Sequence, residues 1–214
     1  MGTANLSGAV SIRFSNFAVP NADQCTGTWA RSVMERETQR KYDLPLQQFL
    51  DHDDPAARLP GTATGEDFGI VGATFGTNAI TLETIDEKAN AGEHAVYGRT
   101  TFRLPPEYEA GQVVQIAVAA GAGTTAADTS MVVDVEAHKV HATNGSAGAD
   151  LVTTAAQDCN NTTAAIKVFS LDASGLEPGD KLEIRVSITT EDAATATVVK
   201  GIINNAYVQC TIRG

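Results

Sequence analysis

The stretch Gly175–Thr190, GLEPGDKLEIRVSITT, restricts the fold more than any other part of the chain. From Leu182 to Ile188 every second side chain is aliphatic, and the residues between are charged or hydroxylic. A period of two is typical of a β-strand that buries one face and exposes the other. Pro178 and Gly179 suit the two central positions of a type II turn. The stretch therefore predicts a turn followed by one strand of a sheet.

Short patterns of this kind recur from Thr62 onward, separated by Gly, Pro, Asn and Asp. In VVQIAVAA, for example, Val114, Ile116 and Val118 share one face. About eight strands favour an all-β fold, an antiparallel two-sheet jelly-roll-like β-sandwich over residues 63–214, whose facing rows interdigitate. The predicted strands are Phe68–Phe75, Ala79–Thr84, Ala95–Leu104, Val113–Ala120, Ser130–Val140, Ala164–Leu171, Lys181–Thr190 and Ala206–Arg213.

Residues 1–62 have a different texture and are predicted to form an irregular N-terminal arm. AVSIRFS alternates like a short edge strand. TWARSVMERETQRKYD places apolar residues at helical spacing ahead of a charged run, which predicts at best a short helix or an irregular segment. Three prolines, Pro45, Pro55 and Pro60, interrupt any regular element in the remainder.

The arm carries an apolar set that has two interpretations. Either these side chains cover an edge of the chain's own sandwich, or they form an interface with a neighbouring subunit. The candidate interface residues are Trp29, Leu44, Leu46, Phe49 and Leu50.

The charge balance excludes several kinds of partner. With 15 Lys and Arg against 26 Asp and Glu, the formal net charge is −11. Such a field repels phosphate backbones, so no nucleic-acid partner is expected. No apolar run approaches the ~20 residues of a membrane-spanning helix, and the first residues lack a secretory pattern, so no membrane partner is expected.

Three widely spaced cysteines, Cys25, Cys159 and Cys210, match no metal-ligand motif. We interpret them as reduced thiols of a protein made in a cytoplasm. Cys210 shares a face with Ala206, Val208 and Ile212 and is predicted to be a small core residue.

Two stretches combine histidine with carboxylates. In DVEAHKVH, Asp134, Glu136 and His138 project from one face of a strand and could bind a divalent ion, but an outward-facing strand has the same pattern, and that interpretation is favoured. In DHDDP, Asp51–Pro55, three carboxylates surround His52, but the Gly and the distal Glu of an EF-hand are missing. A solvated turn is favoured there. No metal site and no cofactor are predicted.

Nothing in the sequence singles out a catalytic centre. The stretch GIVGATFGTN lacks the Lys and Ser/Thr of a phosphate loop, and its glycines are better explained by bulges or close packing. No G-x-S-x-G or H-E-x-x-H motif accompanies the four histidines. The chain is therefore predicted not to be an enzyme. A hydrolase built on a sandwich remains an alternative.

Several stretches resemble a family of tailed-bacteriophage virion structural proteins. They are, in order, LPLQQFLDHDDPAARLPGTATGEDFGIVGATFGT, FRLPPEYEAGQVVQIAVAAG, ADTSMVVDVEAHKV, ADLVTTAAQ, GLEPGDKLEIRVSI and CTIRG, within residues 43–214. None is a catalytic signature. The resemblance implies a jelly-roll capsid decoration or cement protein, bound as a homotrimer to the major capsid protein on the outside of the virion.

Two functions from different classes follow. The first is reinforcement of the head by bridging adjacent capsid subunits, because repeated placement on a shell turns weak contacts into lasting ones. The alternative is a head-fibre or tail-associated module whose loops bind a receptor or host glycans. Exposed aromatic side chains for sugar stacking would favour the alternative.

Overall fold

The computed structural model describes residues 38–72, 79–127, 130–141, 143 and 147–213. Within these ranges the chain is nearly all β, and its helical element is the short 3-10 turn η2 (Leu46–Gln48). The strands are β1 (Thr38–Asp43), β2 (Gly69–Val71), β3 (Thr81–Glu83), β4 (His94–Arg103), β5 (Val114–Ala122), β6 (Met131–Val140), β7 (Ala147–Asp150), β8 (Gln157–Asp158), β9 (Ala165–Ser170), β10 (Lys181–Thr190) and β11 (Gly201–Ile212).

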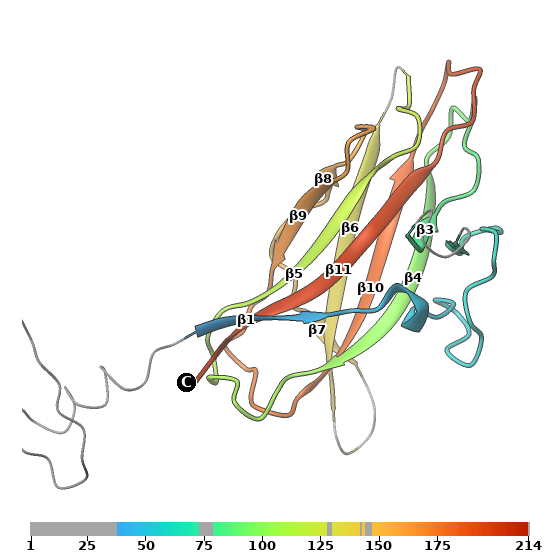
Figure 1. The fold of residues 1–214 in the computed structure, drawn as a ribbon. Coiled ribbons are helices and arrows are strands. Elements are labelled where there is room, and N and C mark those ends of the chain that lie inside the picture. Colours follow the sequence, from blue (N-terminus) through green and yellow to red (C-terminus); the bar gives the residue numbers. More distant parts are fainter. Residues whose placement is uncertain (1–37, 73–78, 128–129, 142, 144–146, 214) are drawn as a thin grey trace, which may run out of the picture. The chain divides into compact units, whose positions relative to one another are not determined.

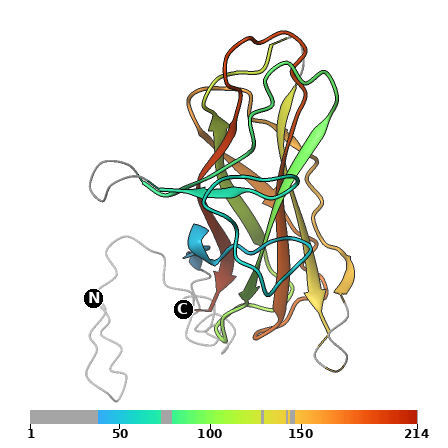
Figure 2. The ribbon, with the colours of Figure 1, turned by 90° about the vertical axis from the view of Figure 1, so that its right-hand side faces the viewer.

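The strands form two antiparallel sheets that pack face to face, so the predicted β-sandwich is confirmed (Figure 1). One sheet has the order β2-β3-β11-β5-β9, and β1 also pairs with β11. We call it the β11 sheet. The other has the order β4-β10-β6-β7, with β8 also paired to β6, and we call it the β10 sheet. Figure 2 shows the two layers from the side.

The alternating patterns locate most strands correctly. β10 has the predicted bounds, and the ends of β4, β6 and β9 lie within a residue of the prediction. β11 begins at Gly201, five residues earlier than predicted, because a register shift between Ile203 and Asn205 breaks its alternation. β7 and β8 were not predicted.

The first described segment corrects the predicted arm. Thr38–Asp43 is neither helical nor irregular but the strand β1, paired in register with β11 from Thr38↔Ile212 to Asp43↔Tyr207. Residues 37–214 form one compact unit. The strand predicted in AVSIRFS and the candidate residue Trp29 lie outside the described residues.

The core lies between the sheets. From the β10 sheet Ile184, Val186 and Ile188 point inward, and from the β11 sheet Ile116 and Val208 meet them, all with no exposed surface. Burying an aliphatic side chain of this size contributes roughly 1.5–3 kcal/mol to folding. Within the described residues, no helix has the length and apolarity to cross a bilayer.

Gly69 confirms that close packing explains a glycine of GIVGATFGTN. A Cβ at this position would lie 2.2 Å from the backbone nitrogen of Ala63 and 2.7 Å from the carbonyl carbon of Thr62. Backbone atoms cannot rotate away, so the strand would have to shift. We expect Gly69→Ala to lower the free energy of unfolding by about 1–3 kcal/mol, the usual cost of overpacking.

Denaturant unfolding of the purified variant measures this cost. Gly61→Ala is the matched control, because a Cβ there meets nothing within 4 Å. Equal midpoints for the two variants would contradict the prediction.

Candidate functional site

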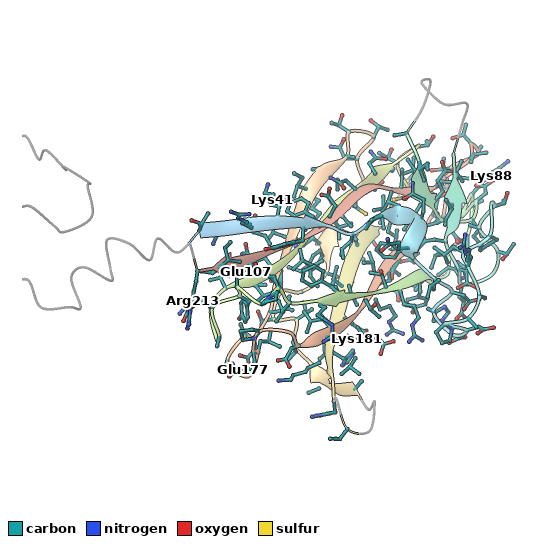
Figure 3. All side chains as sticks on the ribbon, turned by 60° about the horizontal axis from the view of Figure 1, so that its bottom comes forward. Lys41, Lys88, Glu107, Glu177, Lys181 and Arg213 are labelled. Carbon is teal, nitrogen blue, oxygen red and sulfur yellow. The ribbon has the colours of Figure 1, made fainter. Side chains whose placement is uncertain are left out.

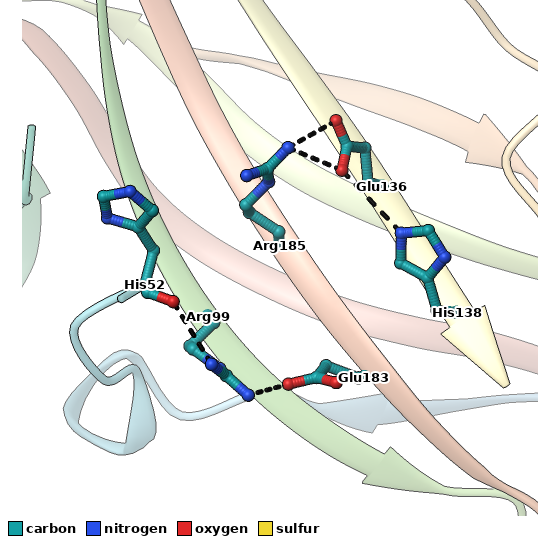
Figure 4. Close-up of a pocket in the computed structure, with 6 residues that line it drawn as sticks. All are labelled: His52, Arg99, Glu136, His138, Glu183 and Arg185. Atoms are coloured by element: carbon teal, nitrogen blue, oxygen red, sulfur yellow. Dashed lines mark hydrogen bonds and ion pairs between the residues drawn. The ribbon is translucent and has the colours of Figure 1, made fainter. Parts of the chain in front are cut away.

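The outer face of the β10 sheet carries a charged groove. Strand register places Arg185 of β10 between Arg99 of β4 and Glu136 of β6. Two residues before Arg185 on β10, and on the same face, Glu183 lies opposite His138 of β6. The groove has a volume of about 390 Å³ and is lined by His52, Arg99, Glu136, His138, Glu183 and Arg185 (Figure 4).

Each carboxylate in the groove is held by an arginine. One terminal nitrogen of Arg185 donates to both carboxylate oxygens of Glu136 at 2.7 Å, and Arg99 forms an ion pair with Glu183 (Figure 4). The hydrogen bond to Glu136 raises the pKa of Arg185. In each pair the arginine neutralises the glutamate, and together the pairs connect three neighbouring strands. This arrangement stabilises the groove and does not make either carboxylate more reactive.

The predicted metal candidate on β6 is part of this polar row. Asp134, Glu136 and His138 point outward, as the favoured interpretation requires. Glu136 is occupied by Arg185, while Nδ1 of His138 lies 3.0 Å from the carbonyl oxygen of Gly148. A carbonyl only accepts, so Nδ1 carries the proton of that bond. Burial raises the pKa of Asp134.

His52, which lines the groove, contacts the ring of Tyr97 on β4. The two rings stack with centroids 4.7 Å apart, and the Arg185 guanidinium lies 4.9 Å from the Tyr97 centroid. Both contacts engage the Tyr97 ring within the protein, so it is not a free platform for a sugar. Among the described residues that line the groove, none is Ser, Thr or Cys, so the lining offers no hydroxyl or thiol nucleophile.

Three adjacent strands of the β11 sheet, β9, β5 and β11, have the opposite character. β5, β9 and β11 contain a single charged residue, Lys167, in a chain whose formal net charge is −11. On their outer face Val168 lies opposite Ala117, which lies opposite Tyr207, and Ile166 lies opposite Ala119. Ile166 is 57% exposed and Val168 is 39% exposed. We call this surface the uncharged face.

Charged groups border the uncharged face on β1 and β3, where Asp43 lies opposite Tyr207 and Glu83 lies opposite Ile202. Lys41 of β1 lies 4.6 Å from the centroid of the Tyr207 ring and donates to its hydroxyl. Arg213 pairs with Glu109 where β11 ends. Figure 3 shows Arg213 and Glu107 near one end of the sandwich and Lys88 near the other.

The arm residues proposed as an interface are mostly part of the core. Leu44, Leu46 and Phe49 are at most 6% exposed and belong to the main apolar cluster, so they are not available to a partner. Leu50 is half-buried, and its backbone exchanges two hydrogen bonds with Arg99. Of the two interpretations, the structure therefore supports the one in which these side chains cover the chain's own sandwich. The uncharged face was not identified from the sequence, although the lack of acidic residues in three predicted strands was visible there.

The described cysteines behave as predicted. Cys159 and Cys210 are free and buried, and burial raises the pKa of Cys159 to about 12 and that of Cys210 to about 11. Thiols with such pKa values stay protonated and unreactive at neutral pH. Cys25 lies outside the described residues.

Comparison with known proteins finds likeness of structure only. No protein-family model matches this sequence, and neither does any curated protein sequence. The CBM22-2 xylan-binding domain of Paenibacillus barcinonensis Xyn10C is 12% identical, with a TM-score of 0.43 over 80% of this chain and 99% of that one. The CBM22-1 domain of the same enzyme is 10% identical, with a TM-score of 0.40 over 84% and 98%.

A chain of the infectious bursal disease virus Gx strain structure is 10% identical, with a TM-score of 0.33 over 69% of this chain and 37% of that one. Such low identities do not indicate what this chain binds.

Proposed function

We propose that this chain is a virion structural protein, a capsid decoration protein that attaches to the outer shell and bridges capsid subunits. The observation that carries the proposal is the uncharged face. In a chain of net charge −11, three adjacent strands without acidic residues and with exposed Ile166 and Val168 suit contact with another protein. The sequence resemblance to phage virion proteins supports the same role.

The charged groove supports a non-enzymatic role. Its two carboxylates are each paired with an arginine, so neither is free to act as a general acid or base while the pairs are intact. The proposal accordingly includes no catalytic residue and no cofactor. The major capsid protein as partner, the homotrimer, synthesis in the host cytoplasm and the position outside the capsid are parts of the same proposal, and they come from the resemblance.

Phage particles made with and without this protein test the proposal. We expect particles that lack it to release DNA at a lower temperature, and addition of purified protein to restore resistance. Labelled antibody should mark the head surface of complete particles. Equal heat resistance together with no label on the head would refute capsid attachment.

We propose receptor or glycan binding as the second candidate, because the groove on the β10 sheet is open and lies within the roughly 300–1,000 Å³ of small-molecule sites. Its lining offers hydrogen-bond donors and acceptors, but the Tyr97 ring is engaged by His52 and Arg185. A glycan array separates the two functions. A specific glycan signal that Arg185→Ala removes, with no binding to particles, would favour this candidate over decoration.

A further inference from the structure

Two segments distant in sequence meet beside the charged groove and bring together metal-binding side chains. One ligand atom each from Asp51, His52 and Asp67 lies within 4.8 Å of the other two. The His52 side chain is only 9% exposed. We propose that these three residues bind a divalent transition-metal ion, zinc in the first place. This inference does not depend on capsid attachment.

The spacing on one side of the imidazole fits two ligands of one ion. Nδ1 of His52 lies 3.1 Å from Oδ1 of Asp67. Ligands bound about 2.0–2.2 Å from a metal in tetrahedral or octahedral geometry lie about 2.9–3.5 Å apart. A nitrogen and a carboxylate oxygen at this separation can therefore share an ion with little movement.

The other side of the imidazole resembles the surroundings of a metal-bound histidine. Nε2 lies 3.3 Å from Oδ1 of Asp53 and 3.8 Å from Oε2 of Glu66. A histidine that binds a metal through one ring nitrogen usually donates its other N–H to a carboxylate, which orients the ring. The Tyr97 ring, 4.7 Å away, holds the imidazole plane from a third side.

The backbone fixes the ligand-bearing segments without help from an ion. Leu50, next to Asp51, exchanges hydrogen bonds with Arg99 of β4 at 2.8 and 3.0 Å. Phe68, next to Asp67, donates to the Tyr97 carbonyl, and Tyr97 donates to the Glu66 carbonyl. Arg99 also donates to the His52 carbonyl at 3.2 Å (Figure 4). Ligands on segments that are already hydrogen-bonded to a strand lose little entropy on binding.

The side chain of Asp51 is oriented by its own turn. Its Oδ1 accepts the backbone N–H groups of Asp53 and Asp54 at 2.8 and 2.9 Å, which confirms the predicted turn. One imidazole with two carboxylates suits zinc, cobalt or manganese better than calcium, which prefers six to eight oxygens.

Titration of the metal-free full chain with Zn²⁺, Co²⁺ and Ca²⁺ tests the site. We expect one Zn²⁺ or Co²⁺ per chain, bound at least ~10-fold more tightly than Ca²⁺, and a Co²⁺ spectrum without the intense near-ultraviolet band of thiolate ligands. Zinc at about 100 times its Kd should raise Tm by about 5–10 °C.

Isosteric variants locate the ligands. Asp67→Asn and Asp51→Asn should each weaken zinc binding at least ~100-fold, and Asp53→Asn about 10-fold. Asp54→Asn is the control, because the Asp54 side chain accepts the backbone N–H of Ala56 and an amide oxygen can replace it there. Circular dichroism and the metal-free Tm show that each variant is folded, and Asp51→Asn keeps the oxygen that caps the turn.

The opposite explanation is an ion-pair cluster around a protonated His52. No saturable binding of Zn²⁺ or Co²⁺ up to millimolar concentration would establish it and overturn the metal site. Equal affinity in all four variants, or preference for Ca²⁺, would overturn it as well.

Discussion

Replacing both Ile166 and Val168 with glutamate is expected to abolish attachment to phage particles and to leave the fold intact. Both side chains point away from the core, whereas Phe169 beside them is fully buried. A carboxylate introduced at a contact must lose its water without gaining a partner, which costs at least several kcal/mol. We expect affinity to fall at least ~100-fold, equivalent to about 2.7 kcal/mol.

Co-sedimentation of purified protein with particles that lack it measures this affinity. The control is Thr101→Glu with Thr189→Glu, which adds the same charge to the outer face of the β10 sheet. If the control reduces attachment as much as the Ile166/Val168 variant, general repulsion is the cause and the uncharged face is not the docking surface. Unchanged attachment in both variants would also exclude it.

Most of the sandwich was predictable because most of its strands bury one face and expose the other. β10 matches its prediction because Leu182 to Ile188 alternate without a break and their inward face has no exposed surface. β1 has no such signal, since its sequence TQRKYD is polar and its residues are mostly exposed. Backbone pairing with β11 holds it in place, and pairing leaves no trace in side-chain periodicity.

The candidate sites were less predictable because strand register and loop closure create them. Arg185 meets Glu136 through the pairing of β10 with β6, across 49 positions of sequence. His52 meets Asp67 because both flanking segments bond to β4. The sequence of DHDDP predicts a solvated turn, and nothing in it indicates that Asp67 lies beside His52. The uncharged face could have been predicted from the sequence, because that prediction requires only the number of charged residues in three predicted strands.

Asp192 is the polar residue on which the loops at one end of the sandwich depend most. It has no exposed surface, and its carboxylate accepts backbone N–H bonds from Ala127 at 2.8 Å, Ala89 at 2.9 Å and Thr195 at 3.3 Å. Ala89 has a φ of 52°, a strained value for a residue with a Cβ, and its bond to Asp192 helps to maintain it.

We expect Asp192→Ala to lower the free energy of unfolding by about 3–5 kcal/mol, because three backbone donors lose a charged acceptor in a buried site. The corresponding fall in Tm is about 10 °C. Asp172→Ala is the control, since that exposed carboxylate accepts one backbone bond, from Ser174, and we expect its loss to lower the free energy of unfolding much less. Denaturant unfolding of both variants gives the comparison, and equal losses would contradict the role of Asp192.

Acid should reveal the same interaction in the wild-type protein. Burial by itself would raise the pKa of Asp192, but the hydrogen bonds from Ala127, Thr195 and Ala89 outweigh it, and the pKa is lowered. A carboxylate with a lowered folded-state pKa stabilises the fold above its unfolded value of about 3.9, and this contribution is lost as the pH falls through the folded-state pKa. The difference in unfolding free energy between wild type and Asp192→Ala should therefore be constant from about pH 5 to 7 and shrink below about pH 4. A difference that persists at about pH 2 would mean that packing, not the ionised carboxylate, holds these loops together.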